Sequence, residues 1–158
     1  MNPGVVKILL ILLLVLPPAL CRAGELEDQI IRHEGVRLHP YVCPAGFLTI
    51  GVGRNLEAQG ITPDEADFLL QNDIQDSLSD LRTIFENFDQ FTPARQKALI
   101  DLRFNLGPDR FRTFKRMIAA VKAGDWNLAA AELKDSLWWT QVQEERRETL
   151  YRQILTGH

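Results

Sequence analysis

The chain has 158 residues, of which 46% are hydrophobic and 25% charged, and its formal net charge is −3. This length and composition are typical of one globular domain that buries a sizeable core without metal or disulfide support. The acidic balance and the lack of a basic run exclude the usual pattern of a nucleic-acid-binding protein, which carries a basic stripe.

The first 23 residues have the organisation of a secretory leader. A start that ends in Lys7 precedes the wholly apolar run Ile8–Leu16, and a short stretch with small residues follows up to Ala23. The apolar run is shorter than the roughly 20 residues of a membrane-spanning helix. We therefore favour a cleaved signal peptide over a signal-anchor, although both stay open, and place the functional domain at residues 24–158. Export to the periplasm or cell wall is expected, with membrane association only through the leader.

Cys21 and Cys43 are the only cysteines. They can form a disulfide in an oxidising compartment if the leader is retained. If cleavage follows Ala23, Cys43 is a free thiol after export, where oxidation is a hazard.

The first elements of the domain are short. A helix is predicted over Gly24–Gly35, and its last glycine is a typical stop signal. The β-prone runs 41–43 and 47–50 flank Pro44-Ala45-Gly46, which predicts a hairpin.

The rest of the chain is predicted to be helical. Thr62-Pro63-Asp64-Glu65 is a strong start signal for a long amphipathic helix whose apolar positions continue to Phe88. Further helices are predicted over residues 92–105, 113–123, 125–133, 136–139 and 144–155. The expected fold class is α+β, with a small hairpin lobe, a long interlobe helix and a helical C-terminal lobe. A cleft between the lobes is the natural place for a ligand.

Three groups with complementary chemistry fall in the predicted small lobe. Glu34 lies at the helix end, and Cys43 and Thr49 lie on the hairpin. In an inverting glycosidase, one acid protonates the leaving group while other groups hold or activate a water molecule. Glu34 can serve as that acid, and Cys43 and Thr49 as the groups that act on water. His33 and His39 flank Glu34, but the histidine next to Glu34 on a helix points away from it. We therefore expect no metal and no cofactor.

The spacing Glu34-x8-Cys43-x5-Thr49, followed by Gly51-Val52-Gly53, resembles the catalytic triad of the phage-type lysozymes, glycoside hydrolase family 24. The likeness continues through 62–74, 98–107, 125–139 and 146–157. The resemblance implies the two-lobed lysozyme fold and a monomeric endolysin of phage or prophage origin. Its expected reaction is hydrolysis of the β-1,4 bonds between N-acetylmuramic acid and N-acetylglucosamine in peptidoglycan.

The resemblance also implies catalytic roles for the three small-lobe residues. Glu34 is then the general acid, and Thr49 helps to hold the attacking water. Cys43 stands where the best-known members have Asp. A thiolate there can act as the base, whereas a neutral thiol only positions water, and a nucleophilic thiol with retention also stays open.

Three residues of the helical lobe resemble substrate-binding residues of the family. Phe104 and Asn105 resemble residues that contact sugar, although Phe104 has a place in the core as its alternative. Arg146 resembles the arginine that approaches the catalytic Glu.

Three alternatives to the lysozyme function stay open. One is a non-catalytic peptidoglycan-binding relative that Cys43 has disarmed. Another is an anchor-tethered endolysin that a Cys21–Cys43 disulfide keeps inactive, and the third is an exported helical module without wall activity.

Overall fold

The computed structural model describes residues 23–158; residues 1–22, which hold nearly all of the predicted leader and Cys21, lie outside the described part. The described chain divides into two compact units, of which the first ends at Ile61 and the second is Thr62–His158. Within residues 23–158, no helix combines the length and the apolar character that crossing a membrane requires. The predicted α+β class is confirmed.

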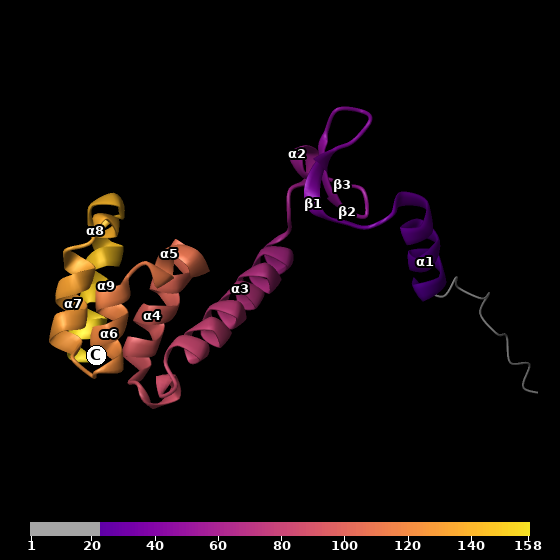
Figure 1. The fold of residues 1–158 in the computed structure, drawn as a ribbon. Helices are drawn as coiled ribbons and strands as arrows, with labels where there is room; N and C mark the ends of the chain where they lie inside the picture. Colours follow the sequence, from indigo (N-terminus) through magenta and orange to yellow (C-terminus); the bar gives the residue numbers. More distant parts are fainter. Residues whose placement is uncertain (1–22) are drawn as a thin grey trace, which may run out of the picture. The chain divides into compact units, whose positions relative to one another are not determined.

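The first unit holds a helix and a small antiparallel sheet, labelled in Figure 1. Its helices are α1 (Ala23–Glu34) and the single turn α2 (Leu56–Gln59). Its strands are β1 (Arg37–Val42), β2 (Leu48–Gly51) and β3 (Arg54–Asn55), hydrogen-bonded in the order β1-β2-β3.

The predicted helix and hairpin of this unit are confirmed, with changes at their ends. Gly35 ends α1 in the left-handed region, at φ 72°, and its N–H donates to the Ile31 carbonyl at 2.8 Å. β1 begins at Arg37, earlier than predicted, and the strand register shifts between Arg37 and Tyr41. Pro40 lies in that interval and has no N–H to donate to the ladder. This is why the sequence pattern did not predict a strand there.

The second unit is helical in the described residues. Its elements are α3 (Pro63–Ile84), the 3-10 turn η1 (Phe88–Gln90), α4 (Pro93–Leu106), α5 (Pro108–Arg112), α6 (Lys115–Lys122), α7 (Trp126–Lys134), α8 (Leu137–Gln141) and α9 (Glu144–Thr156). α3 stops four residues before the predicted limit, because Phe85 has extended backbone angles. The short helix α5 was not predicted.

Side-chain caps explain where these helices begin. The Thr62 hydroxyl accepts from the Glu65 N–H at 3.2 Å, and the Glu65 carboxylate accepts from the Thr62 N–H at 2.8 Å, which completes the predicted capping box. Thr92, Asp125 and Ser136 cap α4, α7 and α8 in the same way. Such caps typically contribute about 1 kcal/mol each.

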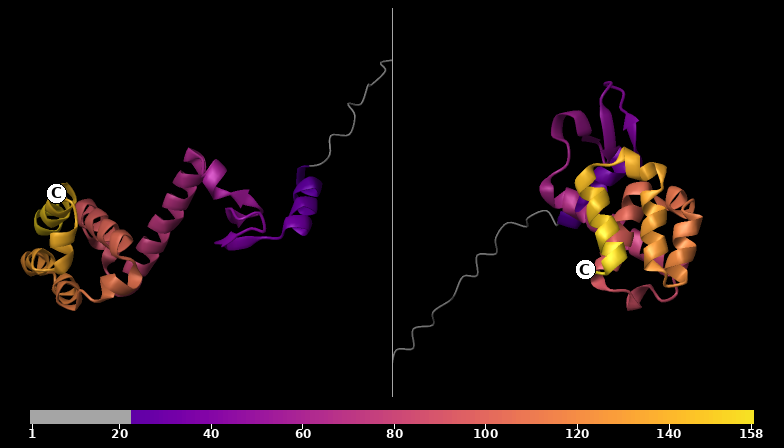
Figure 2. Two further views of the ribbon diagram at one scale, coloured as in Figure 1. Left: turned by 90° about the horizontal axis from the view of Figure 1, so that it is seen from above. Right: turned by 90° about the vertical axis from the view of Figure 1, so that its left-hand side faces the viewer.

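The hydrophobic core belongs to the second unit. Every helix of that unit from α3 to α9 contributes buried side chains, among them Leu81, Leu99, Phe111, Leu133 and Trp138. α7 packs against both α6 and α9, and α4 packs against α9, so these helices lie side by side in Figure 2. In residues 24–61, by contrast, Thr49 is the one buried side chain.

An ion-pair cluster joins α3, α4 and α5. Asp80 on α3 accepts from Arg103 Nε at 3.0 Å and from Arg112 Nη1 at 3.1 Å, and it also pairs with Arg112 Nη2. Arg103 reaches the buried Ser77 hydroxyl at 3.1 Å. Burial raises the pKa of Asp80, whereas the hydrogen bonds from Arg112 and Arg103 lower it. The net effect is a pKa below the usual value of an aspartate.

Replacing Asp80 with Asn is therefore expected to destabilise the protein by about 2–3 kcal/mol at pH 7, because two guanidinium groups lose their partner. Because the pKa of Asp80 is lower in the folded than in the unfolded chain, its ionised form stabilises the protein at pH values above the unfolded pKa, near 3.9. This stabilisation is lost as the pH falls through the folded pKa. Urea unfolding of both proteins at pH 7 and at pH 3 should show the difference shrinking in acid. The matched control is Asp89→Asn, because Asp89 pairs with Arg82 at an exposed site, and its cost should stay under about 1 kcal/mol. Equal costs for the two variants would contradict the structural role of the cluster.

Candidate active site

Glu34 is placed by the end of α1. It is the last residue of the helix and its side chain is exposed in the first unit. The carboxylate lies against the turn between β2 and β3: a Cβ built on Gly53 would sit 3.4 Å from Glu34 Oε2. Gly53 also has φ +79°, a backbone conformation that residues other than glycine rarely adopt. The Gly-x-Gly segment thus lets the backbone pass close to the carboxylate.

Cys43 is placed by the turn that joins β1 and β2. Its N–H donates to the Phe47 carbonyl at 3.0 Å, and its carbonyl accepts from the Gly46 N–H at 2.8 Å. This closed turn keeps the backbone amides of residues 45–47 close to Cys43. The side chain is half-buried.

Thr49 lies next to this turn on β2, opposite Tyr41 in the ladder, and is only 3% exposed. Its hydroxyl donates to the Phe47 carbonyl at 3.0 Å. It also lies within hydrogen-bonding reach of the Cys43 sulfur. A hydroxyl has one proton, so it donates to only one of these two acceptors at a time.

The surroundings of Cys43 favour its thiolate form. The Phe47 amide makes the largest contribution and the Thr49 hydroxyl the next, and the amides of Ala45 and Gly46 add to them. Together these hydrogen bonds lower the pKa of Cys43 below the usual value of a thiol, against a smaller opposing effect of burial. A lowered pKa is the property that a thiol needs in order to act as a base or nucleophile near neutral pH.

The structure thus brings Cys43 and Thr49 together on the hairpin and places Glu34 against the glycine turn that leaves it. The end of α1, the turn between β1 and β2, and strand β2 of the first unit supply the three groups. Their catalytic roles remain predictions.

The three predicted substrate-binding residues lie in the second unit. Phe104, on α4, is 41% exposed, so it is not a core residue of that unit. Asn105 accepts a hydrogen bond from the Trp138 indole N–H at 2.7 Å through its Oδ1, which leaves its amide N–H groups available to a ligand. Arg146 donates from Nε and Nη2 to Asp101 Oδ1, at 2.8 and 2.7 Å.

Sequence reasoning missed Asp101 as the partner of Arg146. A usable signal was present, because Asp101 precedes Asn105 by four residues and therefore shares its face of α4. The distance along the sequence, 45 residues, explains why pattern alone did not join the two.

Gly53→Ala tests the contact with Glu34. We expect a loss of stability of about 1–2 kcal/mol from the left-handed backbone, together with a loss of activity because the new methyl group comes into van der Waals contact with the Glu34 carboxylate. Gly51→Ala is the matched control, since Gly51 has φ +66° but nothing within 4 Å of a Cβ. Urea unfolding and turnover of cell walls should show similar destabilisation for both variants and a larger activity loss for Gly53→Ala. Equal activity would contradict the importance of this contact.

An exposed carboxyl group at a helix end and a thiol–hydroxyl pair on the adjoining hairpin of an α+β protein are groups of the kind that a glycosidase uses for acid/base chemistry. The comparisons with known proteins agree with this class. The model of the family described as Phage lysozyme matches residues 31–153. The chain belongs to the phage lysozyme family.

Individual relatives show how far the likeness extends. The Endolysin of Acyrthosiphon pisum secondary endosymbiont phage 1 is 31% identical over 123 residues, which covers 76% of this chain and 80% of that protein. The protein named Probable T4-type lysozyme 1 of Dictyostelium discoideum is 26% identical over 147 residues, covering 73% and 85%. The Pre-baseplate central spike protein of Enterobacteria phage T4 is 27% identical over 162 residues, covering 85% of this chain but only 28% of that protein.

Proposed function

We propose that the chain is an N-acetylmuramidase that cleaves the β-1,4 bond between N-acetylmuramic acid and N-acetylglucosamine with inversion. Membership of the phage lysozyme family makes it a glycosidase that hydrolyses peptidoglycan. The finer assignment depends mainly on one observation, the placement of the Cys43 sulfur beside three backbone amides and the Thr49 hydroxyl.

In the proposed reaction, Glu34 gives its proton to the glycosidic oxygen as the bond from this oxygen to the anomeric carbon of muramic acid breaks. A water molecule attacks that carbon from the opposite face. The Cys43 thiolate takes the proton of the water, so the thiol and the Glu34 carboxylate are the products on the enzyme. Proton exchange with solvent restores the starting states.

Thr49 positions the water in this proposal. While the sulfur is a thiolate, the hydroxyl donates to it, and the hydroxyl oxygen is free to accept from water. When the thiol is protonated, the hydroxyl donates instead to the Phe47 carbonyl, the bond that the structure has at 3.0 Å. The charge of Cys43 thereby decides which acceptor the Thr49 hydroxyl donates to.

The second unit contributes the sugar contacts in this proposal. The exposed ring of Phe104 packs against a sugar face, and the free amide N–H groups of Asn105 donate to an acetamido carbonyl or a hydroxyl. Arg146, held by Asp101, contacts the substrate through its remaining donors.

The stereochemical course separates the proposal from its rivals. Proton NMR of the first-formed reducing sugar should show the α-anomer, because the water attacks the face opposite the leaving group. The β-anomer would indicate retention and a nucleophilic Cys43. Absence of any new reducing end would indicate a non-catalytic wall-binding protein.

We also propose that the leader exports the domain and is cleaved after Ala23. The mass of the mature N-terminus tests this, since a chain that begins at Gly24 supports cleavage and a chain that keeps Met1 supports a signal-anchor. In the second case, mass spectrometry under non-reducing conditions shows whether Cys21 and Cys43 are bonded. Such a bond would block the sulfur until it is reduced.

A further inference from the structure

The peptide group that joins Phe47 to Leu48, here called the 47–48 peptide, holds both Cys43 and Thr49. Its carbonyl oxygen accepts from the Cys43 N–H and from the Thr49 hydroxyl, each at 3.0 Å. Its N–H belongs to Leu48, the first residue of β2. Because a trans peptide is planar and its N–H and C=O point in opposite directions, a partner on the N–H side also fixes the direction of the carbonyl.

The Leu48 N–H lies beyond the end of the neighbouring strand. β3 pairs with β2 through Thr49–Asn55 and Ile50–Arg54, and the next residue of the chain, Leu56, already begins α2. The position opposite Leu48 in the ladder is therefore helical and not part of a strand. A backbone N–H at such a place needs another acceptor.

Glu57 supplies that acceptor. Its Oε1 accepts from the Leu48 N–H at 3.3 Å. Glu57 lies in the single turn α2, and the Asn55 side chain caps this turn by accepting from the Ala58 N–H at 3.0 Å. A hydrogen bond to a carboxylate is stronger than one between neutral groups. The short turn thus places a charged acceptor where the sheet has no further strand residue.

We propose that Glu57 is a positioning residue: by holding the N–H of the 47–48 peptide, it keeps the carbonyl of this peptide directed at Cys43 and Thr49. The role rests on the proposed function, in which these two groups act on the attacking water. Glu57 itself is exposed and acts on them only through the peptide group.

Two possible effects of Glu57 on the thiol have opposite signs. A negative charge near a thiol disfavours the thiolate, so loss of the charge alone would lower the pKa of Cys43. Loss of positioning would raise this pKa, because the Phe47 amide and the Thr49 hydroxyl that stabilise the thiolate would be held less firmly. The direction in which the pKa moves therefore identifies the role of Glu57.

The pH dependence of alkylation at Cys43 tests the proposal. Purified protein reacts with iodoacetamide, and mass spectrometry of the peptide that contains Cys43 gives the rate. Glu57→Ala should move the midpoint pH upward by about half a unit or more, as expected for the loss of one hydrogen bond. Glu57→Gln keeps an oxygen acceptor and should not move it upward. An unchanged or lower midpoint in Glu57→Ala, or an equal rise in both variants, would overturn the proposal.

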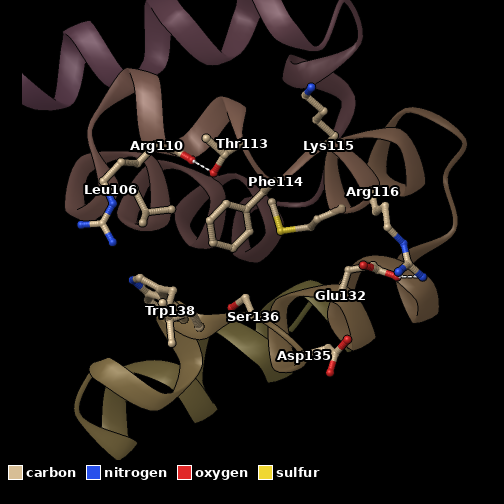
Figure 3. Close-up of a pocket in the computed structure, with 12 residues that line it drawn as sticks. Leu106, Arg110, Thr113, Phe114, Lys115, Arg116, Glu132, Asp135, Ser136 and Trp138 are labelled. Atoms are coloured by element: carbon tan, nitrogen blue, oxygen red, sulfur yellow. Dashed lines mark hydrogen bonds and ion pairs between the residues drawn. The ribbon is translucent and has the colours of Figure 1, made fainter.

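Glu132→Ala is the matched control for the loss of a carboxylate contact. Glu132 Oε1 pairs with Arg116 Nη2 at 2.6 Å in the second unit, as Figure 3 shows. The variant therefore also loses a polar contact, but outside the sheet that carries Cys43. Its alkylation midpoint should equal that of the parent protein. A rise as large as in Glu57→Ala would assign the effect to general destabilisation and overturn the proposal.

Steady-state kinetics on soluble peptidoglycan strands add a second readout. Glu57→Ala should lower kcat about fivefold, the effect of one lost hydrogen bond on the barrier, and Glu57→Gln should recover most of the loss. KM should stay unchanged, because the proposed sugar contacts lie in the second unit. A raised KM with unchanged kcat would contradict a role in positioning the water-binding groups.

The alkylation measurement needs no substrate and so separates this proposal from the hydrolytic function. A protein that hydrolyses walls, but whose midpoint does not rise in Glu57→Ala, would refute the positioning role and leave the muramidase function intact. A midpoint that rises in a protein without hydrolysis would refute the muramidase function and support the placement of the thiol by Glu57.

Discussion

Replacing Glu34 with Gln is expected to abolish hydrolysis of cell walls, with a loss of at least about 100-fold in kcat, because the amide has no proton to give to the glycosidic oxygen. The carboxylate lies at the end of α1 against Gly53, and the amide is nearly the same in size. The loss should therefore appear without a change in fold. Release of reducing ends from purified peptidoglycan is the measurement.

Glu27→Gln provides the matched control for this variant, since Glu27 is an exposed acid on the same helix. It should keep full activity. Circular dichroism and urea unfolding should be the same for both variants and the parent protein. Undiminished hydrolysis by Glu34→Gln would refute the assignment of Glu34 as the general acid.

The second large effect concerns Cys43. A base works in its deprotonated form, so the rate should rise as the pH rises through the pKa of the thiol. That pKa lies below its usual value because of hydrogen bonds from Phe47 and Thr49. Cys43→Ser should lose about 100-fold or more, because the hydroxyl does not ionise in this range.

Cys43→Asp, in contrast, should remain active and move the rising limb of the pH profile to lower pH. The reason is that a carboxyl group ionises near pH 3.9, whereas an unperturbed thiol does so near 8.5. The pH dependence of kcat for the three proteins is the measurement. Full activity of Cys43→Ser, or the same rising limb in Cys43→Asp, would show that ionisation of residue 43 is not required.

Alkylation gives an independent measure of the thiol. Cys43 is the only cysteine in residues 24–158, so the rate of reaction with iodoacetamide reports its ionisation alone. The pH at which that rate reaches half of its maximum should equal the midpoint pH of the rising limb of the activity profile. A midpoint at or above the usual thiol value would contradict the lowered pKa.

Local signals in the sequence predicted elements of both units. The Thr62–Glu65 capping box has the expected hydrogen bonds, and Gly35 ends α1 as expected. The hairpin around Pro44-Ala45-Gly46 forms, because its turn and its β-prone flanks favour the same structure. Such features depend on neighbours within a few residues, which is why they can be predicted from sequence.

The features that the sequence did not predict depend on distant partners or on very short elements. β3 has two residues and α2 has four, too few to show a periodicity. The Asp101–Arg146 and Asn105–Trp138 contacts each join helices that meet only in the folded unit. The amides that lower the pKa of Cys43 belong to the backbone of the turn, so the residue types in the sequence do not indicate them.

The identity of the reducing sugar released from peptidoglycan tests the central claim most directly. Purified protein is incubated with intact sacculi, and the soluble products are analysed by mass spectrometry after borohydride reduction. We predict fragments that end in reduced N-acetylmuramic acid, formed by the parent protein and not by Glu34→Gln. Fragments that end in reduced N-acetylglucosamine, or no soluble fragments at all, would contradict the assignment as an N-acetylmuramidase.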